Sequence, residues 1–324
     1  MKIVLNGVSG QDGFFIADKL NNFNFEIIGI SRESKGINLD KLKNLYPKIK
    51  ILKVNFEDRN QTESFFDNFD FDVFFNLAGP SSVKWCSDNP ALTWQQSVQP
   101  VMNILEAISK KNKFENLHFV QALSSEMYAG SENREIAENS ELCPLTPYGF
   151  AKSAIFQLLL SRRISNSGIT TNLIMFNHES SLRPPHYITK KLVTELIKVK
   201  YGESEFIEVG DLSLKRDWSF AGDFMDAACL AIMKNIDGDF VLGSGKLHSI
   251  HELAKIIHSY LEISRPLDEI LFVKENLIRG IETKPIYGNS SKAHKILNWT
   301  PKFSLVEFLQ IMIDDCLKDL NRIY

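Results

Sequence analysis

The stretch "KIVLNGVSGQDGFF" at residues 2–15 decides the fold. It reads as a buried strand, a glycine-rich turn and the start of a helix, with Gly7, Gly10 and Gly13 three residues apart. Glycines at this spacing permit a tight turn and leave room for an anion at the helix N-terminus. The order of strand, turn and helix predicts the first unit of a nucleotide-binding parallel sheet. An ordinary strand-to-helix turn is the alternative interpretation.

The first half of the chain continues to alternate short apolar runs with helical patterns. Strands are predicted at 25–32, 48–56, 71–79, 117–125 and 170–178, with helical patterns between most of them. Such alternation is typical of an α/β fold with a doubly wound, Rossmann-type parallel sheet.

After residue 178 this regular alternation fades. We therefore expect residues 1–177 to form the cofactor-binding domain, with a return segment near 210–245. Residues 178–324 are expected to form mainly a smaller α/β lobe that binds the substrate.

Composition excludes several classes of protein. The 324 residues are 44% hydrophobic and 24% charged, as in an ordinary globular enzyme. A net charge of −3 disfavours a nucleic-acid coat, which needs a dominant basic face. The four cysteines show no CxxC pair, so neither a metal site nor a disulfide framework is predicted. The apolar runs are too short for a signal peptide or a membrane span, and we expect a cytoplasmic protein.

The motif "TPYGFAK" carries the first candidate catalytic residues. Tyr148 and Lys152 lie four residues apart on a predicted helix and project from the same face. An ammonium beside a phenol favours the phenolate, so we expect the pKa of Tyr148 to fall from about 10 toward neutrality. Ser124 ends a strand about two dozen residues earlier. Together with the glycine turn, this trio predicts a catalytic site.

The stretch "ALSSEMY" adds a carboxylate, Glu126, directly after Ser124 and Ser125 at the end of a predicted buried strand. A buried charge is costly unless something uses it, so Glu126 is a candidate catalytic residue. A structural pairing with a nearby lysine is the alternative.

The segment "GISRES" follows the second strand and bears on the cofactor. An acidic residue here would bind the ribose 2′-hydroxyl of NAD, whereas Ser31 and Arg32 offer donors suited to a 2′-phosphate. NADP is therefore favoured over NAD. Alternatively, Arg32 is a solvated loop charge.

The glycine turn, "NLAG" at 76–79, the strand-end hydroxyl and YxxxK together resemble the extended short-chain dehydrogenase/reductase superfamily. Within it, "FNHES", "KRDWSFAGDF" and "SKAHKILNW" resemble the GDP-mannose 4,6-dehydratase family, and the resemblance runs almost end to end. It implies an NADP-dependent enzyme that turns a GDP-hexose into its 4-keto-6-deoxy product with loss of water.

The resemblance also implies roles for individual residues. Tyr148, beside Lys152, would take the proton of the sugar O4, Ser124 would hydrogen-bond O4, and Glu126 would act as acid and base at C5 and C6. The implied cofactor-binding residues, besides Tyr148 and Lys152, are Gly7, Gly10, Gln11, Asp12, Gly13, Arg32, Asn55, Phe56, Leu77 and Ala78. The implied substrate-binding residues are Ser81, Ser125, Asn177, Glu179, Lys191, Arg216, Arg279 and Glu282. A homo-oligomer, dimer or tetramer, is expected through the long helices after the fourth and fifth strands.

Several positions depart from the family pattern. Ser124 stands where threonine is usual, Asn55 where an acidic residue is usual, and Arg183 alone where the family has an arginine pair that helps to build a tetramer. "PSSVKW" replaces a glutamine and a serine-histidine pair. These differences resemble a side branch that acts on other GDP-sugars, including GDP-N-acetylglucosamine, in bacterial surface glycan pathways.

Two other classes of function stay open. A sugar-nucleotide epimerase or 4-ketoreductase would share the fold but needs no base at C5, so Glu126 counts against it. A regulatory or scaffold protein that binds a cofactor without turnover would have no need of the Ser124, Tyr148 and Lys152 set.

Overall fold

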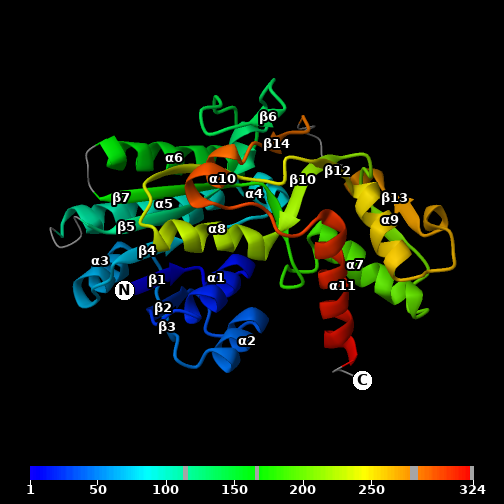
Figure 1. Ribbon diagram of the computed structural model, residues 1–324, viewed down its shortest axis with the longest axis horizontal. Coiled ribbons are helices and arrows are strands. Elements are labelled where there is room, and N and C mark those ends of the chain that lie inside the picture. Colours follow the sequence, from blue (N-terminus) through cyan, green and yellow to red (C-terminus); the bar gives the residue numbers. More distant parts are fainter. Residues whose placement is uncertain (112–115, 165–167, 278–283, 322–324) are drawn as a thin grey trace.

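The computed structural model describes residues 1–111, 116–164, 168–277 and 284–321. Its centre is a seven-stranded sheet in the order β11-β7-β5-β4-β1-β2-β3, and every neighbouring pair is parallel (Figure 1). This confirms the predicted α/β fold class. The strands are β1 (Lys2–Asn6), β2 (Glu26–Ser31), β3 (Lys50–Lys53), β4 (Val73–Asn76), β5 (His118–Ser124), β7 (Ile169–Met175) and β11 (Gly238–Leu242).

Helices cover both faces of this sheet (Figure 1). One layer contains α1 (Gln11–Asn21), α2 (Ile37–Leu45), α8 (Ala221–Met233) and α10 (Ser291–Leu297). The other contains α3 (Arg59–Asn68), α4 (Val83–Asp88), α5 (Pro90–Ser109) and α6 (Pro147–Ile164). Because both faces are covered, the strands are nearly continuous apolar runs, and all four residues of β4 are buried.

Helix α1 lies unusually close to the glycine turn, and Gly13 makes this approach possible. A Cβ at residue 13 would lie 2.4 Å from the carbonyl oxygen of Gly7 and 2.6 Å from Cα of Val8. The helix begins after Gly10, and within the described residues no side chain caps that end. Its first N–H groups are therefore open to a ligand.

A second group of elements packs around its own apolar cluster. Helices α7 (Ile188–Lys200), α9 (Ile250–Tyr260) and α11 (Leu305–Asn321) enclose side chains such as Leu196, Ile257 and Phe308. Small sheets lie within this part or beside it. They are β12-β10-β8 (Leu247–Ser249, Lys215–Phe220, Asn177–Glu179), β13-β9 (Leu271–Val273, Ile207–Val209) and β14-β6 (Tyr287–Gly288, Glu135–Ile136). Of these, β13-β9 lies within this part. Short 3₁₀ turns η2 (Ser125–Tyr128), η3 (Leu267–Glu269) and η4 (Glu275–Leu277) complete the described elements.

The third strand is shorter than the sequence suggests. The run 48–56 contributes only Lys50–Lys53. The reason lies just beyond it, where Asp58 caps α3 by accepting hydrogen bonds from the amides of Asn60 and Gln61. The chain leaves the sheet to enter that helix, although the apolar pattern continues to Phe56.

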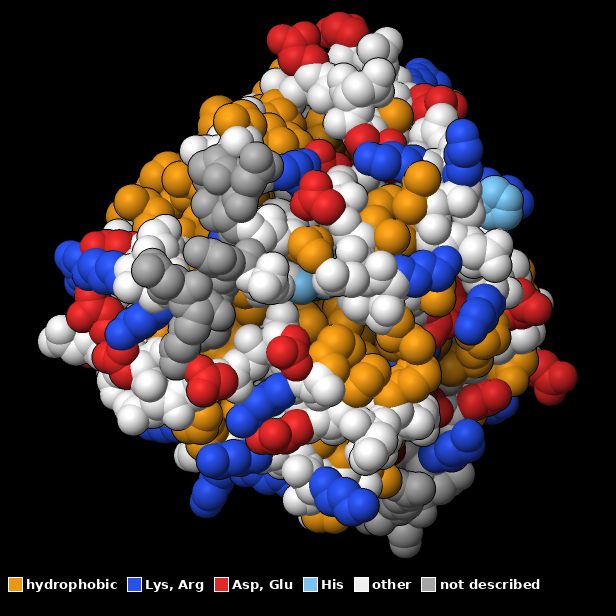
Figure 2. Space-filling model, turned by 60° about the vertical axis from the view of Figure 1, so that its left-hand side comes forward, with side chains coloured by type: hydrophobic (Ala, Val, Ile, Leu, Met, Phe, Trp, Pro, Cys, Tyr) orange, Lys and Arg blue, Asp and Glu red, His pale blue; other side chains and the backbone are white. Residues whose placement is uncertain are grey.

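The surface is mixed in charge, in keeping with the net charge of −3. On the face seen in Figure 2, lysine and arginine side chains are interspersed with acidic ones and with apolar patches. None of the helices in the described ranges is long and apolar enough to cross a bilayer.

Candidate active site

A cavity of about 960 Å³, including the space at its open mouth, lies at the carboxyl ends of the central strands. This is where parallel sheets of this type bind ligands. Four segments line it: the glycine turn, the loop after β4, the end of β5 with α6, and the chain after β7. They contribute Gly7, Gly10, Gln11, Asp12, Gly13, Leu77, Gly79, Pro80, Ser81, Val83, Ser124, Ser125, Glu126, Tyr148, Lys152, Asn177, His178 and Arg183.

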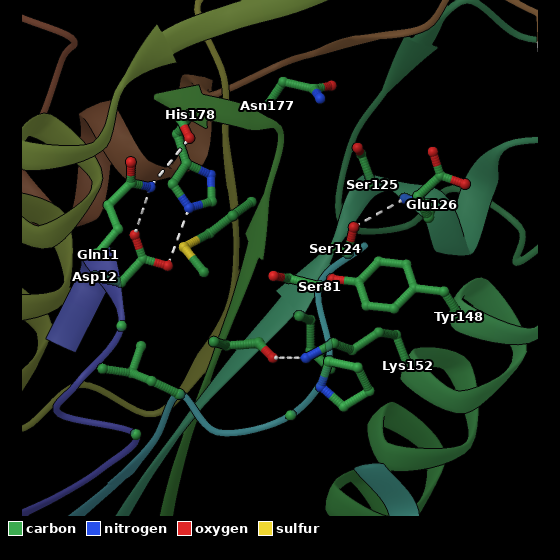
Figure 3. A pocket seen from close by; sticks show the side chains of 18 of the residues that line it. Gln11, Asp12, Ser81, Ser124, Ser125, Glu126, Tyr148, Lys152, Asn177 and His178 are labelled. Carbon is green, nitrogen blue, oxygen red and sulfur yellow. Dashed lines mark hydrogen bonds and ion pairs between the residues drawn. The ribbon is translucent and has the colours of Figure 1, made fainter. Parts of the chain in front are cut away.

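Tyr148 and Lys152 stand on the first two turns of α6, on one wall of the pocket (Figure 3). They are only 8% and 6% exposed. Lys152 Nζ donates a 2.9 Å hydrogen bond to the carbonyl of Ala122 and lies 5.7 Å from the centre of the Tyr148 ring. Helix α6 is thereby tied to the end of β5, the strand that carries Ser124.

The expected lowering of the pKa of Tyr148 is wrong for this structure. Burial raises the pKa of the phenol above its ordinary value, and the charge of Glu126 adds to the increase. A hydrogen bond from Ser124 acts in the opposite direction. Burial also lowers the pKa of Lys152 to about 8. Sequence spacing shows which groups are neighbours, but it does not show how much desolvation both of them suffer.

Glu126 lies where the sequence predicts it, in the wall that carries Tyr148 (Figure 3). Strand β5 ends at Ser124, whose hydroxyl accepts a 3.2 Å hydrogen bond from the amide of Glu126 and starts the turn η2. Helix α6 packs directly on this turn, because a Cβ at Gly149 would lie 2.5 Å from the carbonyl oxygen of Glu126. Two backbone contacts thus fix the carboxylate-bearing residue relative to the phenol.

A smaller recess adjoins the main cavity at Glu126. Ser125, Glu126 and Asn177 line both spaces, and Arg216 and Lys284 line the recess. Two cationic side chains therefore lie close to the candidate acid and base.

The opposite wall is a network centred on Asp12 and His178 (Figure 3). His178 Nε2 lies 3.1 Å from Asp12 Oδ2, and Nδ1 lies 2.7 Å from the carbonyl of Phe176. Both partners accept, so both ring nitrogens donate and the imidazole carries a positive charge. Gln11 Nε2 donates to Asp12 and to the carbonyl of His178, and Ser180 donates to Gln11 Oε1. The network joins the glycine turn to β8.

This network sets the charges in the wall. Burial alone would raise the pKa of Asp12, but His178, Arg183 and Gln11 together hold it at about 2. Burial lowers the pKa of His178, yet the Asp12 carboxylate raises it above its ordinary value.

The residues predicted to bind the cofactor occupy two regions. Gly7, Gly10, Gln11, Asp12, Gly13 and Leu77 line the cavity. Ala78 lies against the turn, with its amide nitrogen 2.9 Å from a Cβ built on Gly7. Farther along the sheet edge, Arg32 is half-exposed and pairs with Glu57 at 2.7 Å, and Asn55 Oδ1 accepts from the amide of Glu57. Phe56 is buried among Phe65, Phe66 and Phe74.

The glycine turn fits a dinucleotide. A Cβ at Gly10 would meet only the carbonyl oxygen of Gly7 within 4 Å, so this side of the turn is open toward the cavity. The open N-terminus of α1 faces the same space. Backbone amides without a covering side chain are what a diphosphate requires.

The predicted substrate residues divide into three groups. Ser81, Ser125 and Asn177 line the cavity, and Arg216 lines the recess beside it. Glu179 is buried and accepts hydrogen bonds from Arg183 and Thr189. Lys191 Nζ donates to the carbonyl of Glu208. Among the residues that the structure describes, Glu179 and Lys191 are not part of the cavity lining. Arg279 and Glu282 lie outside the described residues.

His178 and Arg183 were not predicted as site residues, although both line the cavity. No local pattern in "FNHES" distinguishes His178 from its neighbours. Its role in the wall depends on its contact with Asp12, 166 positions away in the sequence.

A seven-stranded parallel sheet, a glycine turn and a serine, a tyrosine and a lysine that line one cavity together define a protein of the extended short-chain dehydrogenase/reductase superfamily. The family model described as GDP-mannose 4,6 dehydratase matches residues 4–312, and the chain belongs to this family. The GDP-mannose 4,6 dehydratase of Drosophila melanogaster is 28% identical, over 96% of this chain and 84% of that protein.

Solved structures share the fold at lower identity. UDP-glucose 4-epimerase from Thermotoga maritima, determined with UDP-glucose, gives a TM-score of 0.84 at 22% identity over 99% of this chain and 100% of that one. RMD from Pseudomonas aeruginosa, complexed with NADPH, gives 0.81 at 17% identity over 98% and 99%.

Replacing Asp12 by Asn is expected to lower the free energy of unfolding by about 2 kcal/mol near pH 5, where both Asp12 and His178 are charged. The stabilisation that the Asp12 carboxylate gives the folded state is fully present above the ordinary pKa of 3.8 and is lost as the pH falls through about 2. The stabilisation that the charged His178 imidazole gives is fully present below its ordinary pKa of 6.5 and is lost as the pH rises through its raised pKa in the folded state. Urea unfolding across this range, with exposed Glu141→Gln as control, measures the effect. A difference between D12N and wild type that does not vary with pH would contradict it.

Proposed function

We propose that the protein is an NADP-dependent nucleotide-sugar 4,6-dehydratase that converts a GDP-hexose to its 4-keto-6-deoxy product with loss of water. One observation carries the proposal: Glu126 lines the same cavity as Ser124, Tyr148 and Lys152. A 4-epimerase or 4-ketoreductase needs the last three but has no use for a carboxylate at C5. GDP-mannose and GDP-N-acetylglucosamine are the candidate substrates, in bacterial surface glycan biosynthesis.

In the proposed reaction Tyr148 takes the proton from the sugar O4, and Ser124 donates a hydrogen bond to the oxygen as charge develops there. The positive charge of Lys152 stabilises the phenolate. When bound, the oxidised nicotinamide would accept the hydride of C4 and return it at C6. The 4-ketone acidifies the C5 hydrogen, which Glu126 removes as a proton and passes to the C6 hydroxyl, so that water leaves. Tyr148 then returns the O4 proton to C5. The net change is the loss of one water, and Tyr148 is again protonated.

The high pKa of Tyr148 and the lowered pKa of Lys152 bear on this role. Burial opposes a charge on either group alone. A phenolate and an ammonium formed together neutralise each other, so transfer of a proton away from Tyr148 is easiest while Lys152 stays protonated. A buried base of this kind is also protected from competing water.

The cofactor would lie on the glycine turn, with its diphosphate at the N-terminus of α1. Arg32 supports NADP over NAD, because its guanidinium offers donors to a 2′-phosphate at the end of β2, whereas the Ser31 hydroxyl is buried and donates to Ser9 Oγ. Asn55, Leu77 and Ala78 would lie at the adenine end, and Phe56, whose ring is buried among other phenylalanines, would contribute through its backbone.

The sugar nucleotide would enter past Glu126 toward the recess. Ser81, Ser125 and Asn177 would contact the hexose, and Arg216 the diphosphate, since a guanidinium donates two parallel hydrogen bonds to a phosphate. Glu179, Lys191, Arg279 and Glu282 stay predictions for the nucleotide end.

Incubation with a panel of GDP-, UDP-, CDP- and dTDP-hexoses, with NADP or NAD, tests reaction and substrate together. We expect loss of one water, detected by mass, from GDP-mannose or GDP-N-acetylglucosamine, and faster turnover with NADP. Inversion at C4 without a change of mass would contradict the dehydratase and support an epimerase.

Glu126→Gln is expected to reduce water loss on the order of a thousandfold, as for removal of a positioned acid and base. Because the first step does not need Glu126, reduced nicotinamide should still form in a single turnover. Tyr148→Phe, the matched comparison, should suppress both reduced nicotinamide and water loss. Fluorescence titration should show unchanged cofactor binding by E126Q. Dehydration by E126Q at a near-normal rate would remove Glu126 from this role.

We further propose a homodimer through α5 and α6. Several large apolar side chains on these helices are exposed, among them Trp94 at 49%, Met102 at 45% and Phe150 at 55%. Exposed apolar side chains on adjacent helices fit a covered interface. Light scattering should report a multiple of the 37.0 kDa chain mass, reduced by M102E combined with F150E. A monomeric wild-type protein would contradict this proposal.

A further inference from the structure

Tyr187 is held firmly at the start of α7. Its amide donates a 3.2 Å hydrogen bond to the carbonyl of Pro184, and its own carbonyl accepts one of 2.8 Å from the amide of Lys191. The guanidinium carbon of Arg183 lies 4.2 Å from the centre of its ring. Arg183 in turn donates to Glu179 at 3.3 Å, and Glu179 is only 2% exposed. The backbone and one face of the ring are therefore fixed from within the second part of the molecule.

The hydroxyl of Tyr187 reaches across to the first part. It lies 2.7 Å from the Oγ of Ser81, 106 positions away in the sequence, and either oxygen can be the donor. Ser81 belongs to the loop after β4 and lines the cavity together with Tyr148. Figure 3 shows the side chains of Ser81 and Tyr148 directed into this pocket. The contact thus connects the start of α7 with the wall predicted to meet the hexose.

We infer that Tyr187 is a positioning residue for the hexose of the substrate, acting through Ser81; this deepens the proposed function and rests on it. A serine hydroxyl rotates freely and can direct its proton toward several partners. A second hydroxyl at hydrogen-bond distance fixes one of these directions. The remaining hydrogen-bonding capacity of Ser81 then points to the cavity, so the sugar meets a group that is already oriented.

A purely structural role would give a different signature. If the contact only joined the two parts of the chain, its loss would lower stability and weaken all ligands alike. If it orients Ser81 toward the sugar, its loss affects ligands that carry the hexose and spares those that lack it. GDP and the GDP-hexoses provide this comparison.

The test measures dissociation constants of Tyr187→Phe for GDP, GDP-mannose and GDP-N-acetylglucosamine by titration calorimetry, with NADP present. The variant keeps the ring and its contact with Arg183. We expect about tenfold weaker binding of the preferred GDP-hexose, as for loss of one hydrogen bond, and unchanged binding of GDP. In turnover, KM should rise more than kcat falls. Tyr201→Phe removes the hydroxyl of an exposed tyrosine at the other end of α7 and should change the dissociation constants of neither GDP nor the GDP-hexoses.

A double-mutant cycle with Ser81→Ala decides whether Tyr187 acts through Ser81. The combined variant should bind the GDP-hexose no more weakly than S81A alone, because the two losses are one and the same. Additive losses, equal weakening of GDP, or unchanged GDP-hexose binding by Y187F would each overturn the inference. Binding is measured independently of turnover, so a wild type that binds a GDP-hexose but releases no water contradicts the dehydratase alone. A wild type that binds neither GDP-hexose contradicts both proposals.

Discussion

The close packing of helix α6 on the turn after β5 is the constraint on which the candidate site depends. Gly149 has no side chain, and the helix backbone therefore reaches the carbonyl of Glu126. One turn farther along, Lys152 is tied to Ala122 in β5. The hydroxyl, carboxylate, phenol and ammonium come from two segments of the chain, and these two contacts set their mutual positions. Catalytic groups need such fixed geometry, because small displacements reduce rates strongly.

Two pairs of ionisable side chains line this cavity, Asp12 with His178 and Tyr148 with Lys152, and burial affects the two pairs differently. Asp12 and His178 stabilise each other, so both stay ionised although they are buried. Tyr148 and Lys152 are each pushed by burial toward the neutral form. One wall thus carries an ion pair whose partners favour each other's charged forms, and the other carries two groups that burial drives toward their neutral forms. Environment, more than residue type, separates a structural pair from a reactive one.

Much of this arrangement was visible in the sequence. The glycine spacing at residues 7–13, the apolar runs of the strands and the YxxxK spacing are local signals, and they predict the fold class and the grouping of Ser124, Tyr148 and Lys152. The role of Glu126 beside them is what the family resemblance implies. Contacts between distant segments were not predictable. No spacing rule shows that Asp12 meets His178, or that Glu179 is used to hold Arg183. The pKa of Tyr148 was mispredicted for the same reason, since desolvation depends on everything packed around the phenol.

The last strand of the main sheet has a consequence for synthesis of the chain. Strand β11 pairs with β7 only after the polypeptide has passed through β8, α7 and β10. Until the ribosome has delivered residue 242, the outer hydrogen-bonding edge of β7 has no neighbour, and unpaired strand edges invite association with other chains. Helix α8, which covers this side of the sheet, emerges just before β11. A nascent chain stopped near residue 180 would therefore be prone to aggregate, and the seven-stranded sheet reaches its native form only after residue 242 has been made.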